Sequence, residues 1–129
     1  MSTVSVRYIV HDVDDALAFY CEHLGFEVQA RPAPIFAMLR RGDLRLLLSA
    51  PAAPGQPGGG SQPMSDGTRP QPGGWNRFQV EVDALEATVE GLRAAGVPFR
   101  SDIIVGVGGD QAIVEDPSGN LVELFRPKS

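Results

Sequence analysis

Residues 4–26 read VSVRYIVHDVDDALAFYCEHLGF, and residues 76–97 read NRFQVEVDALEATVEGLRAAGV. Each stretch starts with an alternating apolar run, typical of a strand, and continues with apolar residues at helical spacing. In both copies an Asp, which favours a helix start, stands 13 residues before a Gly, which favours a helix end. The two pairs are Asp12 with Gly25 and Asp83 with Gly96. The sequence therefore predicts a duplicated strand–helix unit.

Composition restricts the class of protein. The chain has 129 residues, 43% of them hydrophobic and 21% charged, which is typical of one soluble globular domain. It has no apolar run long enough for a membrane span, no secretory signal at its start, and one cysteine, Cys21. We therefore expect a cytoplasmic protein without a membrane partner. A net charge of −5 and scattered arginines argue against nucleic-acid binding.

The rest of the chain completes each unit with further strands. Strands are expected after each helix and on both sides of two turn signals, Arg41-Gly42-Asp43 and Asp116-Pro117-Ser118-Gly119-Asn120. The expected strands are 26–29, 35–40, 44–49, 99–104, 111–115 and 121–125. This order predicts an α+β fold of two βαβββ modules, each with one sheet face covered by its helix. Pairing of the two sheets would form a curved surface with the helices outside.

Residues 50–74 differ in kind, with six prolines and seven glycines. This composition does not bury a core, so the segment is either a linker between the modules or a lid over a pocket. We expect one domain, 1–129, with module one at about 4–49, the connecting loop at about 50–74 and module two at about 75–127.

Two motifs carry a family resemblance. The first is Asp12 followed by Leu17, Phe19-Tyr20 and Leu24-Gly25-Phe26, and the second is the Asp116–Asn120 turn that leads into Glu123-Leu124. Together they resemble the vicinal oxygen chelate superfamily, which includes glyoxalase I, the extradiol dioxygenases, methylmalonyl-CoA epimerase and the bleomycin-resistance binding proteins. The resemblance implies two βαβββ modules that form a U-shaped cleft.

The resemblance also implies a divalent metal held by one residue on each of four strands. The matching positions here are Ser5, Leu47, Arg77 and Glu123. Only Glu123 has a side chain suited to such a metal, because Leu47 has no donor atom and Arg77 is permanently positive. We therefore expect no metal and no cofactor, and we expect Arg77 to pair with Glu123.

Strand alternation predicts which side chains face the cleft. The candidate ligand-binding residues are Arg7, Arg45, Leu47, Trp75, Arg77, Gln79, Glu123 and Phe125. Their mixture of polar, aliphatic and aromatic groups is typical of a pocket for an organic molecule, although a solvated sheet face has similar charges. Trp75 is either a core residue or an aromatic wall of the pocket. Neither His11 nor His23 belongs to a recognisable catalytic set, and no catalytic residue is predicted.

These features favour a metal-independent protein that binds a small organic ligand, similar to the bleomycin-resistance branch, for which the resemblance implies a homodimer. Such a protein would sequester an antibiotic or a metabolite. The alternatives are a metal-dependent lyase, isomerase or dioxygenase with relocated ligands, and an accessory subunit without a ligand. The net negative charge suits a cationic ligand, whereas the predicted arginines suit an anionic one. We give the local charges more weight, because salt screens fields beyond about 10 Å.

Overall fold

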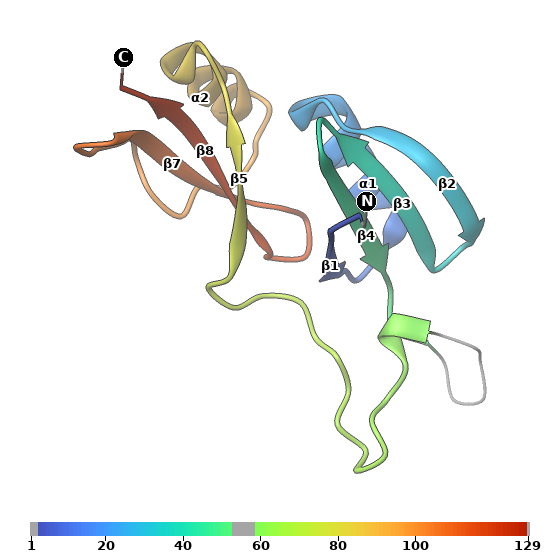
Figure 1. Cartoon of the computed structure of the whole chain (residues 1–129). Coiled ribbons are helices and arrows are strands. Elements are labelled where there is room, and N and C mark those ends of the chain that lie inside the picture. The colour runs from blue at the N-terminus through green and yellow to red at the C-terminus, as the bar shows by residue number, and fades with distance from the viewer. Residues whose placement is uncertain (1–2, 53–58, 129) are drawn as a thin grey trace. The chain divides into compact units, whose positions relative to one another are not determined.

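The computed structural model describes residues 3–52 and 59–128. The chain divides into two compact units, Met1–Gly73 and Gly74–Ser129, and each is described by itself. Each unit holds one helix and one four-stranded sheet among its described residues (Figure 1), with module one in blue to green and module two in yellow to red. None of the described helices is long and apolar enough to cross a membrane.

Module one contains four strands and one long helix. Its elements are β1 (Ser5–Ile9), α1 (Val13–Leu24), β2 (Glu27–Ala33), β3 (Phe36–Arg41) and β4 (Leu44–Ser49). The sheet order is β1-β4-β3-β2, with β1 parallel to β4 and the other pairs antiparallel. A 3₁₀ turn, Gly59–Ser61, follows in the connecting segment.

Module two repeats this topology. Its elements are β5 (Arg77–Glu81), α2 (Leu85–Ala94), β6 (Ile104–Val105), β7 (Gly109–Glu115) and β8 (Leu121–Pro127). The sheet order is β5-β8-β7-β6, again with one parallel pair, β5 with β8. The predicted α+β fold of two βαβββ modules is confirmed. The U-shaped cleft between them stays a prediction.

Helix α1 begins and ends as the sequence predicts. The Asp12 carboxylate accepts a hydrogen bond from the backbone N–H of Asp15 at 3.0 Å, and Gly25 takes the left-handed conformation with φ of 71°. The helix packs on the sheet through its buried side chains Val13, Ala16, Phe19, Tyr20 and Leu24. The helix lies against β4, whose residues Leu46 and Leu48 are also buried. Leu17, expected in this stripe, is half-buried.

Helix α2 begins differently, and the prediction that Asp83 caps it is wrong. The N-cap is Ala84, with no side-chain hydrogen bond to the first turn. The end is as expected: Gly96 has φ of 84°, and the N–H groups of Gly96 and Val97 donate to the carbonyls of Arg93 and Leu92. Leu85, Val89 and Leu92 are buried as predicted, whereas Ala95 is exposed.

The strand predicted at 99–104 is also wrong in extent. Phe99 forms an isolated bridge with Val114, and β6 contains only two residues. The Ser101 hydroxyl accepts from the Ile113 N–H at 3.1 Å and so takes the place of a strand carbonyl. A side-chain hydrogen bond to β7 therefore replaces strand pairing in the segment that hydrophobicity alone assigns to a strand.

The predicted reversal between β7 and β8 is confirmed. Asp116 Oδ1 accepts from the N–H groups of Ser118 and Asn120 at 2.9 and 2.8 Å. Gly119 takes the positive φ, 85°, that the turn requires. This closed turn fixes the register of β8 against β7, and β8 carries two of the candidate ligand-binding residues.

Candidate ligand-binding faces of the two sheets

Strand alternation gives each sheet a face turned away from its helix, here called the open face of that module. In module one, Leu46 and Leu48 are buried on the α1 side, so Arg45, Leu47 and Ser49 of β4 lie on the open face. The parallel partner strand places Arg7 opposite Leu47. The predicted residues Arg7, Arg45 and Leu47 therefore share one face.

Arg7 is held between an aromatic ring and a glycine. Its guanidinium carbon lies 6.0 Å from the centre of the Phe36 ring, at the outer limit of a cation–π contact. On another side lies Gly60, where an added Cβ would come within 2.1–2.4 Å of Nη1, Cζ and Nε of Arg7. The near-equal separations show that the guanidinium plane lies against the glycine, so a side chain at position 60 would displace the guanidinium of Arg7.

The neighbouring strand β4 carries two polar atoms that lack a partner. Arg45 Nε and Ser49 Oγ are buried, and neither has a hydrogen bond among the described residues. Ser49 is 1% exposed. A buried polar group without a partner costs about 1–3 kcal/mol, so two of them on one face require an explanation.

In module two, the predicted residues also share the open face. Val80, Val122 and Leu124 are buried toward the core, and the register places Gln79 opposite Glu123 and Glu81 opposite Phe125. Arg77 lies two residues before Gln79 on the same face of β5. Phe125 is half-buried.

Arg77, Gln79 and Glu123 are joined by hydrogen bonds. Arg77 Nε donates to Glu123 Oε1 at 3.0 Å, and Gln79 Nε2 donates to Glu123 Oε2 at 2.7 Å. Each carboxylate oxygen of Glu123 thus has its own donor. Because Glu123 is only 9% exposed, these two hydrogen bonds offset the cost of removing its charge from water. The predicted pairing of Arg77 with Glu123 is confirmed.

Trp75 lies at the edge of this arrangement, and the alternative that it is a core residue is wrong. It is 67% exposed, and the guanidinium of Arg100 lies 5.1 Å from its ring centre. Its carbonyl accepts from Arg77 Nη1 at 3.4 Å, and Arg100 in turn donates to Glu115 at 3.1 Å. These six residues are called the polar cluster of module two: Trp75, Arg77, Gln79, Arg100, Glu115 and Glu123.

The residues at the implied metal positions do not fit a divalent ion. Ser5, Leu47 and Arg77 supply no carboxylate or imidazole, and both oxygens of Glu123 already accept hydrogen bonds from Arg77 and Gln79. A guanidinium 3.0 Å from the carboxylate would repel a cation there. Within residues 3–52 and 59–128, no group of three His, Cys, Asp or Glu side chains is arranged to hold a metal.

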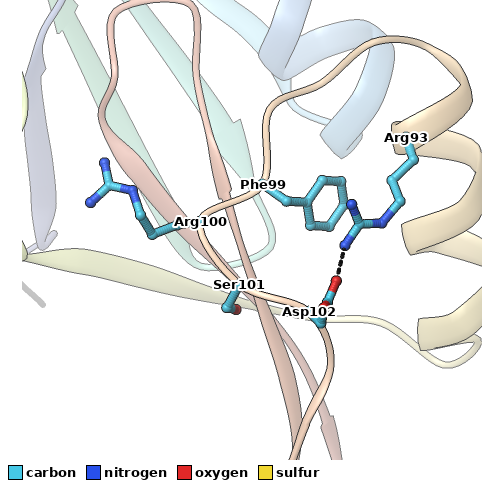
Figure 2. A pocket seen from close by; sticks show the side chains of 5 residues that line it. All are labelled: Arg93, Phe99, Arg100, Ser101 and Asp102. Carbon is cyan, nitrogen blue, oxygen red and sulfur yellow. Dashed lines mark hydrogen bonds and ion pairs between the residues drawn. The ribbon is translucent and has the colours of Figure 1, made fainter.

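Two shallow hollows lie away from the predicted residues. The first, about 230 Å³, contains Arg93, Phe99 and Asp102. Figure 2 shows Arg93 and Asp102 pointing toward each other beside the Phe99 ring, with an ion pair of 2.6 Å and a cation–π distance of 4.3 Å. The second, about 360 Å³, contains the ion pair of Arg31 with Asp14. Arg100 also lines the first hollow and pairs with Glu115. Every arginine that lines these two hollows therefore already has a carboxylate partner.

Ser49 of module one and Gly60 of the connecting segment were absent from the predicted set, as were Arg100 and Glu115 of module two. Ser49 follows Leu47 by two positions and faces the same way, so strand alternation could have included it. Gly60 had no usable signal, because it is one of three consecutive glycines in the connecting segment and only the structure singles it out.

Comparison with known proteins identifies the family. The chain belongs to the Glyoxalase/Bleomycin resistance protein/Dioxygenase superfamily, whose family model matches residues 3–124. No curated protein sequence matches significantly.

Three similar crystal structures share the fold. A superfamily member from Sphaerobacter thermophilus has a TM-score of 0.74 at 23% identity, covering 98% of this chain and 97% of its own. TnmS3, an antibiotic binding protein from Streptomyces sp. CB03234, has 0.72 at 22%, covering 99% and 97%. Lactoylglutathione lyase from Agrobacterium tumefaciens has 0.71 at 21%, covering 97% and 92%.

Proposed function

We propose that this protein binds a small organic molecule on the open faces of its sheets and does so without metal chemistry, acting as a cytoplasmic homodimer that sequesters its ligand. The observation that carries the proposal is the hydrogen bonding of Glu123. The one carboxylate at the implied metal positions is held by Arg77 and Gln79, so it organises polar recognition instead of coordinating an ion.

The composition of the open faces supports binding of an organic ligand. Both open faces combine polar groups with apolar or aromatic surface. In module one these are Arg7, Arg45 and Leu47. In module two, Trp75 and Phe125 add aromatic surface beside the polar side chains. Such mixtures are typical of small-molecule sites, where a few polar groups orient a largely apolar ligand. The structural similarity to TnmS3, which is an antibiotic binding protein, supports an organic ligand.

Metal independence is tested on protein purified without chelator. We expect elemental analysis to find no stoichiometric transition metal, and we expect added Zn²⁺, Ni²⁺, Fe²⁺ or Mn²⁺ not to raise the melting temperature. A stoichiometric ion whose removal abolishes ligand binding would contradict the proposal and favour the metal-dependent lyase, isomerase or dioxygenase.

Ligand capture is tested through Trp75, the only tryptophan. Because its ring is exposed beside Arg100, its fluorescence should report an organic molecule bound to the polar cluster of module two. We expect saturable changes with members of a compound library and a one-to-one stoichiometry by native mass spectrometry, which also gives the oligomeric state. The variant Glu123→Gln removes the central carboxylate of the polar cluster. Its matched control is Glu90→Gln, which makes the same change of charge on the exposed surface of α2. A library without any binder would favour an accessory subunit.

A further inference from the structure

The two open faces differ in their charge balance. In the polar cluster of module two, Arg77 pairs with Glu123 and Arg100 pairs with Glu115, so the formal charges cancel. On the open face of module one, neither Arg7 nor Arg45 forms an ion pair with any described residue. Of the two open faces, only that of module one therefore carries arginines without an ion pair among the described residues.

These two arginines are close neighbours on the sheet. Arg7 lies opposite Leu47 and Arg45 opposite Ser5, so they are offset by two residues on adjacent strands. Neighbouring strands lie about 4.8 Å apart and two residues rise about 6.6 Å, so these positions are about 8 Å apart. Two arginine side chains at this separation can both reach a single anionic group. Among the strands of this sheet the only acidic residue is Glu27 of β2, which lies opposite Arg40 of β3. Arg40 separates Glu27 from Arg45, and it forms no ion pair with either Glu27 or any other described residue.

Unused hydrogen-bonding capacity coincides with this charge. Arg45 Nε is a buried donor without an acceptor, and the buried Ser49 hydroxyl lacks a partner on the same face of the same strand. Leu47 stands between them, and Met38 and Phe36 of β3 lie opposite Leu47 and Ser49. Donors without acceptors thus adjoin an apolar surface.

We propose that the open face of module one binds an organic anion, with its acidic group on Arg7 and Arg45 and its apolar body over Leu47, Met38 and Phe36. This inference rests on the proposed function and names the class of ligand. An anion would supply the acceptors that Arg45 Nε and the Arg7 guanidinium lack. Gly60 positions Arg7 by lying flat against its guanidinium.

The test compares two fluorescent probes of similar shape and different charge. 1-Anilinonaphthalene-8-sulfonate is an apolar anion, and N-phenyl-1-naphthylamine is its neutral counterpart without the sulfonate. We expect the full-length protein to bind the anion at least tenfold more tightly than the neutral probe. Equal binding of the two probes would overturn the anion site and leave the proposed function standing, whereas failure of both probes to bind would contradict the two together.

Variants assign the preference to particular side chains. Arg7→Gln and Arg45→Gln should each raise the dissociation constant of the anionic probe roughly tenfold, because a charged hydrogen bond to the probe is lost. The dissociation constant of the neutral probe should change less than about twofold. Arg69→Gln removes the same charge from the exposed connecting segment and should leave both probes unchanged. An equal effect of Arg69→Gln would mean that net charge alone sets the preference, and this result would overturn the proposal.

Gly60 gives a test that removes no charge. The Cβ of Gly60→Ala should displace the flexible Arg7 guanidinium, and the variant should fold normally. Its affinity for the anionic probe should fall several-fold, and its affinity for the neutral probe should stay unchanged. Gly108→Ala is the control, because a Cβ there meets no atom within 4 Å. Unchanged anion binding in Gly60→Ala would remove Gly60 from the site.

Competition against the bound anionic probe identifies the acidic group. Displacement by decanoate but not decyl phosphate indicates a carboxylate ligand, and the reverse indicates a phosphate. Decanol is the neutral control, and equal displacement by decanol would overturn the proposal.

Discussion

The two modules share one topology but use their open faces in opposite ways. At the centre of module two, Gln79 faces Glu123, and Arg77 completes a closed set of hydrogen bonds. At the equivalent place in module one, Arg7 faces Leu47, and no carboxylate is provided. Duplication of the backbone thus did not duplicate the chemistry: one face satisfies its own polar groups, and the other presents donors without acceptors.

This difference separates structural from ligand-binding roles for residues of the same type. An arginine paired with a buried carboxylate contributes to the stability of its module, because removal of the arginine leaves the buried carboxylate without a counter-charge. An arginine without a partner costs little to remove from the free protein and matters when a ligand is present. Stability and ligand affinity should therefore respond to different arginines.

The largest expected effect is the loss of stability when a core residue of either module is truncated. Leu48 and Leu124 are both 0% exposed on the helix-covered faces of β4 and β8. Leu48→Ala and Leu124→Ala should each lower the free energy of unfolding by about 3 kcal/mol, because each leaves a cavity. Leu47→Ala, half-buried on the open face, is the control and should cost about 1 kcal/mol. Urea denaturation measures all three, and a small loss at only one core position would break the equivalence.

The second prediction addresses the contrast between the open faces directly. Glu123→Gln should lower the free energy of unfolding by about 2 kcal/mol, because Arg77 loses its counter-charge in a partly buried site. Arg7→Gln should change it by less than about 0.5 kcal/mol, since no ion pair is lost. Thermal denaturation of both variants without ligand is the measurement. A large loss in Arg7→Gln would show that Arg7 supports the fold.

The third prediction uses the helix starts, where the repeat in sequence is not a repeat in structure. Asp12→Ala should cost about 1 kcal/mol, because the hydrogen bond to the Asp15 N–H is lost. Asp83→Ala should stay within about 0.5 kcal/mol, because Asp83 does not cap α2. Chemical denaturation distinguishes the two, and equal losses would show that Asp83 supports its module by another contact.

The fold was largely predictable because local signals and global topology agree. The cap at Asp12, the glycines at both helix ends and the Asp116–Asn120 turn each have a local cause that single residues reveal. The errors arose where two local solutions compete. Asp83 has the residue type of a cap without its geometry, and the Ser101 hydroxyl takes a hydrogen bond that a strand would have used.

The candidate site was predictable in its faces but not in its contacts. Period-two alternation placed Arg7, Arg45 and Leu47 together, and it predicted that Arg77 would meet Glu123. It could not show that Trp75 is exposed, nor that Gly60 lies against Arg7, because these contacts depend on irregular segments without a periodic signal. Whether the grouped residues bind a ligand stays a prediction.

The smallest expected effect comes from an ion-pair group in module two. Arg126 of β8 donates to both carboxylate oxygens of Glu86 in α2 and also to Asp110, which pairs with Lys128 as well. The hydrogen bonds from Arg126 lower the pKa of Glu86 from 4.5 to about 2. The pKa of Asp110 is lowered by Lys128 first and then by Arg126.

Because the folded-state pKa of Glu86 lies below its unfolded value, its contribution to stability is fully present above pH 4.5 and is lost as the pH falls toward 2. Glu86→Gln should therefore flatten the decline of melting temperature between pH 4.5 and 2, by a few degrees at most, since the pair is exposed and screened by salt. Glu90→Gln, on the same helix but without an ion pair among the described residues, should retain the wild-type slope. Identical pH profiles for wild type and Glu86→Gln would show that this ion pair does not join α2 to the sheet in solution, and the asymmetry between the modules would then rest on their open faces and their helix starts.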